Sequence, residues 1–302
     1  MNESLLTRAM ARIGEANPMH GSRVERVVGE MDSLYRERAE RFFGQLEAFL
    51  ASRGRSFDDA VDAYLRLCDS MVAERLHFMR TGSYSSRSFA EVEARVYSNP
   101  KEMEAHVFGL AIAQFLWKDQ YRRFDFFCGG LPRYGGAIRS YLEVGGGHAL
   151  YLAEALRLLP AHVRFTLVDV SASSIEMARG MTPIERVRFI QGDINELDLN
   201  SRYDFITAGE VLEHVEQPRT LLARLRSLLT DEGHAFITAP ANAPTLDHIY
   251  LFNDAGEVRT MLIEEGFVIE EERRVYAEDV SEEKARRYKV AEMYAAFVRK
   301  AR

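Results

Sequence analysis

Two patterns of hydrophobic positions divide the chain. Up to about Tyr134 the apolar residues recur at three- and four-residue intervals, which is typical of amphipathic helices. From about Arg139 short apolar segments alternate with helical segments, which is typical of a sheet covered by helices. We therefore predict an all-helical cap domain over residues 1–134, on the substrate side, and an α/β domain over residues 135–302.

The first pattern predicts long helices. An apolar stripe predicts one helix over residues 24–50, and a second helix begins after Ser56. A further helix is predicted from Pro100 to about Phe127, because Asn99 is a favoured N-cap residue and proline suits the first helical position.

The second pattern predicts a Rossmann-like, doubly wound and mostly parallel sheet of seven strands with helices on both faces. Ligands of such sheets bind at the carboxyl ends of the strands, where the strand order reverses. Strands are predicted at 140–144, 163–168, 187–190, 204–207, 234–238, 267–272 and 291–298, and helices at 148–159, 171–179, 218–229 and 255–265.

Composition narrows the function classes. The 39 basic and 46 acidic residues make the chain mildly acidic, which argues against a nucleic-acid duplex as partner. Cys68 and Cys128 are too few for a disulfide framework or a zinc cluster, so we expect a reducing cytoplasm and no metal. The longest apolar stretch, Val107 to Trp117, is too short to cross a membrane. A small molecule is the expected partner, and a homodimer is left open.

A glycine cluster follows the first strand. Gly145, Gly146 and Gly147 end that strand and open a helix, in the run from Tyr141 to His148. Glycines allow a sharp turn and let a ligand approach the main chain. A cluster of this kind also fits an ordinary tight turn, so it does not by itself identify a cofactor site.

Two aspartates add to this signal. Asp169 ends the second strand about 22 residues after the last glycine, where a carboxylate can accept hydrogen bonds from a ribose diol. Asp193, after Gly192 and the third strand, is suited to bind an adenine amino group. Leu150 replaces the third glycine of the dinucleotide fingerprint, which disfavours a nicotinamide cofactor. Each aspartate alone also fits a helix cap or a turn.

Together with the run from Glu210 to His214, these motifs resemble the class I S-adenosylmethionine (SAM)-dependent methyltransferases over roughly residues 135–302. The resemblance implies SAM as cofactor, with the glycine loop at its methionine and ribose part, Asp169 at the ribose and Asp193 at the adenine. His148 stands where the family often has a small residue. The implied cofactor-binding residues are Glu143, Gly145, Gly146, Gly147, Asp169, Val170, Gly192, Asp193, Ile194 and Glu210.

Candidate catalytic residues follow the fourth strand and come from the end of the helical region. Glu210, Glu213 and His214 are candidates for proton removal, although His214 also fits a packing role. Tyr97, Asn99 and Tyr134 are polar candidates on the cap side of the pocket.

Candidate substrate contacts lie in two segments. Trp117 and Tyr121 belong to an aromatic segment that fits either sulfonium stabilisation or core packing, and Arg133 fits either the SAM carboxylate or a surface charge. Asn242, His248 and Tyr250 follow the fifth strand, where loops shape acceptor pockets. Asp247 and His248 could form a metal pair, but the sequence offers no third ligand at a suitable spacing.

Three functions remain open. The leading hypothesis is methyl transfer from SAM to nitrogen, oxygen or carbon of a small molecule in specialised-metabolite biosynthesis. The second is intramolecular cyclisation of SAM to azetidine-2-carboxylate with release of methylthioadenosine, because the helical cap and the Tyr97–Pro100 segment resemble enzymes of that kind. The third is a non-catalytic SAM-binding protein. The fold cannot decide between them.

Overall fold

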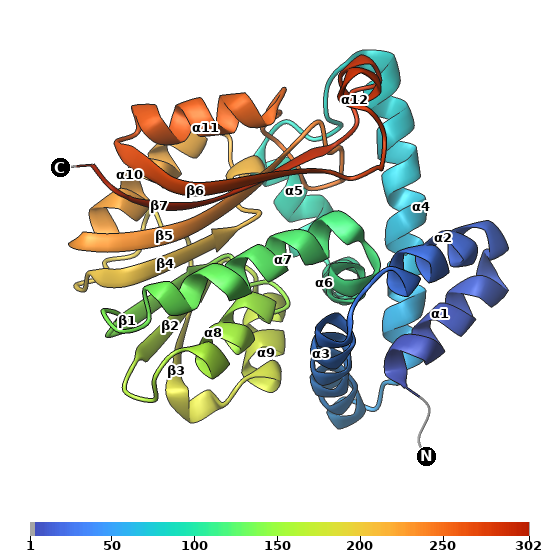
Figure 1. The fold of residues 1–302 in the computed structure, drawn as a ribbon, viewed down its shortest axis with the longest axis horizontal. Coiled ribbons are helices and arrows are strands. Elements are labelled where there is room, and N and C mark those ends of the chain that lie inside the picture. The colour runs from blue at the N-terminus through green and yellow to red at the C-terminus, as the bar shows by residue number, and fades with distance from the viewer. Residues whose placement is uncertain (1–3, 302) are drawn as a thin grey trace.

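The N-terminal part of the chain is entirely helical. The computed structural model describes residues 4–301. The helices that precede the sheet wrap around one side and one end of the molecule (Figure 1). They are α1 (Leu5–Ala16), α2 (Pro18–Gly29), α3 (Ser33–Ser52), α4 (Phe57–Thr81), α5 (Phe89–Val92), the π-helix η1 (Glu93–Tyr97), α6 (Pro100–Leu116), α7 (Lys118–Gly130) and the 3-10 turn η2 (Leu131–Arg133).

Two of the predicted helices are each interrupted once. The helix predicted over residues 24–50 is broken before α3, where the Asp32 carboxylate caps the new helix by accepting the Tyr35 amide at 2.8 Å. The helix predicted from Pro100 to Phe127 is broken at Trp117, whose backbone is extended (φ −103°, ψ 122°). The apolar positions continue across both breaks, so periodicity alone could not reveal them.

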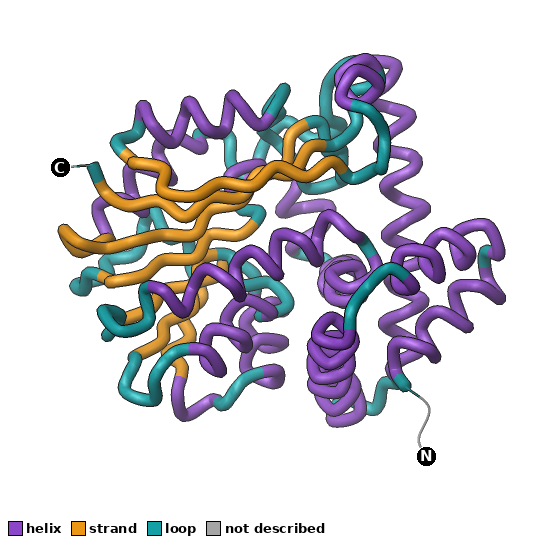
Figure 2. Tube along the Cα trace, viewed as in Figure 1, coloured by secondary structure: helices purple, strands orange, loops and turns teal. Residues whose placement is uncertain are grey.

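The sheet confirms the predicted fold class. Its seven strands lie in the order β3-β2-β1-β4-β5-β7-β6 (Figures 1 and 2). β7 runs in the opposite direction to the other six strands. The strands are β1 (Ser140–Val144), β2 (Arg164–Asp169), β3 (Val187–Gln191), β4 (Tyr203–Gly209), β5 (Leu229–Ala241), β6 (Phe267–Tyr276) and β7 (Glu292–Lys300).

Helices cover both faces of this sheet. One face carries α7, α8 (Leu150–Leu158) and α9 (Ala172–Met181), and the other carries α10 (Pro218–Leu228) and α11 (Ala255–Glu264). The remaining elements are η3 (Ile184–Arg186), η4 (Leu212–His214) and α12 (Glu282–Arg287). Each face has its own apolar cluster, and the cluster under α7 and α8 continues into the N-terminal helices. Among residues 4–301, no helix has both the length and the apolar character needed to cross a bilayer.

Aromatic rings join α7 to the middle of the sheet. Phe126 and Phe127 of α7 pack with ring centroids 5.2 Å from Phe297 and 5.1 Å from Phe236, respectively. A Cβ atom added at Gly130 would lie 2.2 Å from the Phe297 ring, so the helix backbone approaches the strand as closely as glycine allows. Burial of these rings fixes α7, and the residues that follow it, against β5 and β7.

We expect Phe297→Ala to lower the free energy of unfolding by about 3 to 5 kcal/mol, since it removes a fully buried ring from this contact. Urea unfolding followed by circular dichroism measures the change. Ile263→Ala, on the exposed side of α11, is the control and should cost about 1 kcal/mol or less. Gly130→Ala alone should also destabilise the protein, but much less in the Phe297→Ala background, where the clashing ring is gone. Equal effects of Gly130→Ala in both backgrounds would contradict this packing.

Candidate functional site

A cavity of about 540 Å³ opens at the carboxyl ends of β1, β2 and β4. The strand order reverses between β1 and β4, which is where ligands of doubly wound sheets bind. The loops after β1, β2 and β3 form one side of the cavity. Residues of α4, η1 and α6, together with the loops after β4 and β5 that contact them, form the other side. Its volume is that of a pocket for one small-molecule ligand or cofactor.

The glycine loop leaves backbone open to this cavity. Gly145 (φ 69°) and Gly147 (φ 46°) have left-handed backbone conformations, which disfavour any side chain. Added Cβ atoms at Gly145 and Gly146 would lie 2.6 Å from Val211 and 2.3 Å from Leu167, whereas at Gly147 no atom lies within 4 Å. The first two glycines therefore allow close packing of the loop, and Gly147 faces open space in the cavity wall.

Asp169 presents a buried carboxylate beside that loop. Its Oδ2 accepts the Gly147 amide at 3.2 Å and its Oδ1 accepts the Ser171 amide at 2.8 Å. Burial raises the pKa of Asp169 to about 6, although both amide hydrogen bonds oppose the shift. The side-chain cap of α9 is Ser171, whose hydroxyl accepts the Ser174 amide, so the alternative in which Asp169 serves as that cap is wrong.

Glu143 lies deeper, in β1, and is also buried. It accepts a hydrogen bond from the Tyr141 hydroxyl at 3.0 Å, and that hydroxyl is also 2.7 Å from the Thr207 hydroxyl. Burial raises the pKa of Glu143 to about 8. Glu143 and Thr207 both line the cavity, so the floor of the site is polar and holds little charge at neutral pH.

Gly192, Asp193 and Ile194 line the cavity after β3, and Val170 lines it after β2. The Asp193 carboxylate accepts the Asn195 amide at 2.8 Å, which is a turn-forming hydrogen bond. The turn interpretation of Asp193 is therefore satisfied in the structure, and its contact with adenine stays a prediction.

Glu210 ties the end of β4 to the helical part of the chain. It has a left-handed backbone (φ 55°), accepts the Thr238 hydroxyl at 2.7 Å and forms an ion pair with Arg123 of α7. Arg123 is fully buried and also bonds Gln120, which lines the cavity. The sequence analysis missed Arg123, because a single arginine within an aromatic helix carries no motif. A role for Glu210 in proton transfer stays a prediction.

A cluster of histidines forms the opposite wall. The Tyr97 hydroxyl lies 3.3 Å from His214 Nδ1, and the same nitrogen lies 3.0 Å from the Asp247 carbonyl oxygen. His106 Nε2 lies 3.1 Å from an Asp247 carboxylate oxygen. Burial opposes ionisation of Asp247, but the neighbouring histidines outweigh it and hold its pKa well below the usual range. His106, which the sequence analysis missed, lies on α6 far from any motif.

Two predicted pocket residues are misplaced. Arg133 pairs with Glu271 at 2.7 Å, and the Tyr134 hydroxyl donates to Glu270 at 3.0 Å. Both residues lie in the turn that leads into β1, and hence near the amino end of that strand, whereas the cavity is at the carboxyl ends. The predictions that Tyr134 is catalytic and that Arg133 binds substrate are therefore wrong.

Four further candidates do not line the cavity. Tyr121 packs edge-on against Tyr35 with centroids 4.7 Å apart, which bears out its core-packing alternative. Asn99 accepts the Glu102 amide at the start of α6. Asn242 donates to the Asn253 carbonyl at 2.6 Å and the Tyr250 hydroxyl points to Glu257, so both amide and phenol stabilise the loop after β5. Of the cap-side and loop candidates, Tyr97, Trp117 and His248 do line the cavity.

The glycine loop, the buried carboxylate at the end of β2 and the cavity at the strand-order reversal are typical of Rossmann-like nucleotide-binding proteins. Residues 142–235 match a family described as a methyltransferase domain. The chain is 32% identical over 105 residues to the mitochondrial ubiquinone biosynthesis O-methyltransferase of Schizosaccharomyces pombe, a match that covers 33% of this chain and 37% of that protein. It is 31% identical over 100 residues to a malonyl-(acyl-carrier protein) O-methyltransferase of Halalkalibacterium halodurans, covering 32% and 36%.

The solved structure of the mitomycin 7-O-methyltransferase has the same fold, with a TM-score of 0.52 and 15% identity over 77% of this chain and 68% of that chain. The chain spans less than half the length of the curated relatives it matches. The matched residues are therefore similar to a methyltransferase domain, and this likeness supports the class I SAM-dependent family, whose cosubstrate is SAM. The open backbone at Gly147 and the buried carboxylate of Asp169 fit such a ligand.

We expect Asp169→Asn to weaken SAM binding by about 1 to 3 kcal/mol, roughly 5- to 150-fold, because a neutral amide replaces the charged acceptor for the ribose hydroxyls. Isothermal titration calorimetry measures the affinity. Asp198→Asn, an exposed aspartate five residues after Asp193, is the matched control and should bind as the wild type does. Unchanged binding in Asp169→Asn would remove the ribose assignment.

SAM affinity should also depend on pH. The pKa of Asp169 is raised to about 6, so its carboxylate is ionised above that pH and takes up a proton below it. Because only the ionised form accepts two hydrogen bonds from the ribose, we expect affinity to fall as pH decreases from 7 to 5. Calorimetry across this range should give a much flatter profile for Asp169→Asn. The same slope in both proteins would assign the pH dependence to another group.

Proposed function

We propose that the protein transfers the methyl group of SAM to an oxygen atom of a small molecule. One observation carries the proposal: one cavity joins the glycine loop and Asp169 to a wall of aromatic and imidazole side chains. The curated relatives named above are O-methyltransferases, which favours an oxygen acceptor.

The sheet side of the cavity would bind the cofactor. SAM supplies an electrophilic methyl group on a sulfonium, so the protein must mainly position the acceptor and exclude water. In this proposal Asp169 accepts hydrogen bonds from the ribose, Gly147 leaves room for the ligand, and Asp193 and Ile194 contact the adenine. Glu143, which lines the floor of the cavity, would contact the methionine part of SAM.

The helical side of the cavity would bind the acceptor. Trp117 lines the cavity, and its indole donates to the Tyr64 hydroxyl at 2.9 Å, which fixes the ring. An aromatic wall excludes water and stabilises a nearby sulfonium. His214 and His248 line the same wall and offer ring nitrogens toward an acceptor hydroxyl, whose proton must leave during the reaction.

A second candidate function rests on Tyr97. This residue opens the Tyr97–Pro100 segment on which the resemblance to SAM-cyclising enzymes depends, and its hydroxyl reaches His214 inside the cavity. In that reaction the amino nitrogen of SAM forms a bond to its own γ-carbon, the carbon–sulfur bond breaks, methylthioadenosine leaves with the electron pair, and the nitrogen releases a proton.

The location, partners, pathway and oligomeric state of the protein belong to the same proposal. A mildly acidic chain with two cysteines favours the cytoplasm and disfavours a nucleic-acid partner. A specialised-metabolite pathway, a homodimer and the boundary between residues 134 and 135 stay predictions. The shared core of the N-terminal helices and the sheet means that the boundary separates two structural classes within one packed body.

Product analysis distinguishes the functions. The full chain is incubated with SAM alone and with panels of phenols and carboxylic acids, and the nucleoside product is identified by mass spectrometry. We expect S-adenosylhomocysteine only when an acceptor is present, and almost none with Asp169→Asn at limiting SAM. Methylthioadenosine formed from SAM alone would support cyclisation instead. Tight SAM binding with no product in either assay would support the non-catalytic interpretation.

A further inference from the structure

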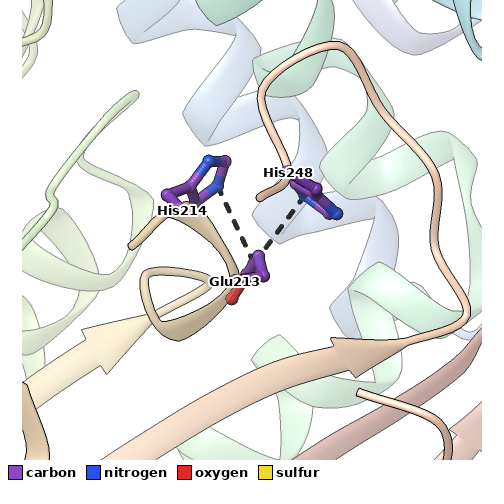
Figure 3. A group of neighbouring side chains, drawn as sticks. All are labelled: Glu213, His214 and His248. Atoms are coloured by element: carbon purple, nitrogen blue, oxygen red, sulfur yellow. Dashed lines mark ion pairs between the residues drawn. The ribbon is translucent and has the colours of Figure 1, made fainter. Parts of the chain in front are cut away.

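Three side chains from two loops that are distant in sequence meet beside the cavity. Glu213 and His214 lie in η4 after β4, and His248 lies in the loop after β5. Figure 3 shows the two imidazoles on either side of the Glu213 carboxylate, and one ligand atom from each residue lies within 4.8 Å of the others. The sequence offers no third ligand near Asp247 and His248 at a suitable spacing, but the fold brings candidates from another loop beside His248.

Hydrogen bonds determine which nitrogen of each histidine is free. His248 Nδ1 lies 2.6 Å from the Ala243 carbonyl oxygen, and His214 Nδ1 lies 3.0 Å from the Asp247 carbonyl oxygen. A carbonyl oxygen can only accept, so Nδ1 carries the proton in both rings and each Nε2 presents a lone pair. This orientation, with Nδ1–H held by a backbone carbonyl, is the one that metal-binding histidines adopt.

Both Nε2 atoms lie near the same carboxylate. His214 Nε2 and His248 Nε2 lie 3.8 Å and 3.9 Å from Glu213 Oε1. Glu213 is fully buried, and within residues 4–301 neither of its oxygens has a hydrogen-bond partner. Buried polar atoms without partners are costly, and lone pairs that face a carboxylate repel it. A cation between the three groups would satisfy all of them.

The separations suit a shared ion. Zinc bonds to imidazole nitrogen and carboxylate oxygen are about 2.0 to 2.2 Å long, so tetrahedral ligand atoms lie about 3.4 Å apart. The two distances to Glu213, 3.8 Å and 3.9 Å, must each close by about half an ångström, and the two imidazole nitrogens, which lie within 4.8 Å of each other, must close by up to about 1.4 Å. Two histidines and a glutamate are one of the ligand sets of catalytic zinc sites, in which the fourth position stays open.

We propose that Glu213, His214 and His248 bind one divalent transition-metal ion of the zinc type, with its open position toward the cavity. His214 and His248 line that cavity, so a bound acceptor can reach the ion. Asp247 and His106 would hold His214 in place without binding the metal, since the Asp247 carboxylate lies 3.1 Å from His106 and 3.4 Å from His214 Nδ1.

The role of the ion rests on the proposed methyl transfer. A metal-bound hydroxyl group releases its proton more readily, and the ion fixes the oxygen that attacks the methyl group. In this form of the site the metal replaces a histidine as the group that activates the acceptor, so His214 would position the ion and would not take up the proton itself.

Metal binding can be measured without SAM or acceptor. The full chain is treated with a chelator, dialysed, and titrated with Zn²⁺ by calorimetry, and a parallel sample is titrated with Co²⁺ and followed by visible absorption. We expect one ion per chain, a tetrahedral Co²⁺ spectrum that Zn²⁺ abolishes, and a rise in melting temperature with Zn²⁺. Glu213→Gln and His248→Ala should each weaken binding by about 100-fold or more. His162→Ala, an exposed histidine beside Arg139, is the control and should bind as the wild type does.

Two results would overturn the site: no stoichiometric Zn²⁺ or Co²⁺ binding by the wild type, or equal binding by the wild type and both ligand variants. The wild-type Co²⁺ spectrum gives an answer even if a variant fails to fold. SAM affinity is measured on the same samples by calorimetry. Normal SAM binding and methyl transfer in chelator, without metal binding, would reject the metal site alone, whereas absence of SAM binding would reject the proposed function.

Discussion

The ion pair between Arg123 and Glu210 is the constraint on which the cavity depends. Arg123 comes from α7 and is fully buried, and Glu210 ends β4 in a left-handed conformation that Thr238 of β5 also supports. Loss of one partner of such a pair leaves a buried charge, which typically costs about 3 to 5 kcal/mol. The pair thus fixes the loop that carries Glu213 and His214 relative to the N-terminal helices that cover it.

The elements that the sequence predicts well are those set by local patterns. Short runs of four to eight residues predicted the strands, and the glycine loop with Asp169 pointed to the edge of the sheet where the cavity opens. Chain direction alone excludes Tyr134 from that edge, because it precedes β1. The break at Trp117 left no trace in the periodicity, since the apolar positions continue on both sides of it.

The cap side could not be predicted because its contacts are long-range. His106 meets Asp247, and Tyr97 meets His214, across more than a hundred residues of chain. No spacing rule relates such residues, and only the topology of the sheet brings the loops after β4 and β5 together. The same holds for Arg123, whose charge is explained only once its partner on β4 is known.

The two sides of the cavity depend on different features of the chain. The sheet side depends on an open backbone at Gly147 and on a buried hydrogen-bond acceptor, the carboxylate of Asp169, in neighbouring loops. The helical side must orient groups that the reaction uses, and there the backbone carbonyls of Ala243 and Asp247 set the tautomers of His248 and His214. With both Nδ1 protons directed at carbonyls, the Nε2 atoms and Glu213 concentrate lone pairs in a buried space. The metal ion proposed above would stabilise that arrangement, and it would give the loop after β5 a chemical as well as a structural role.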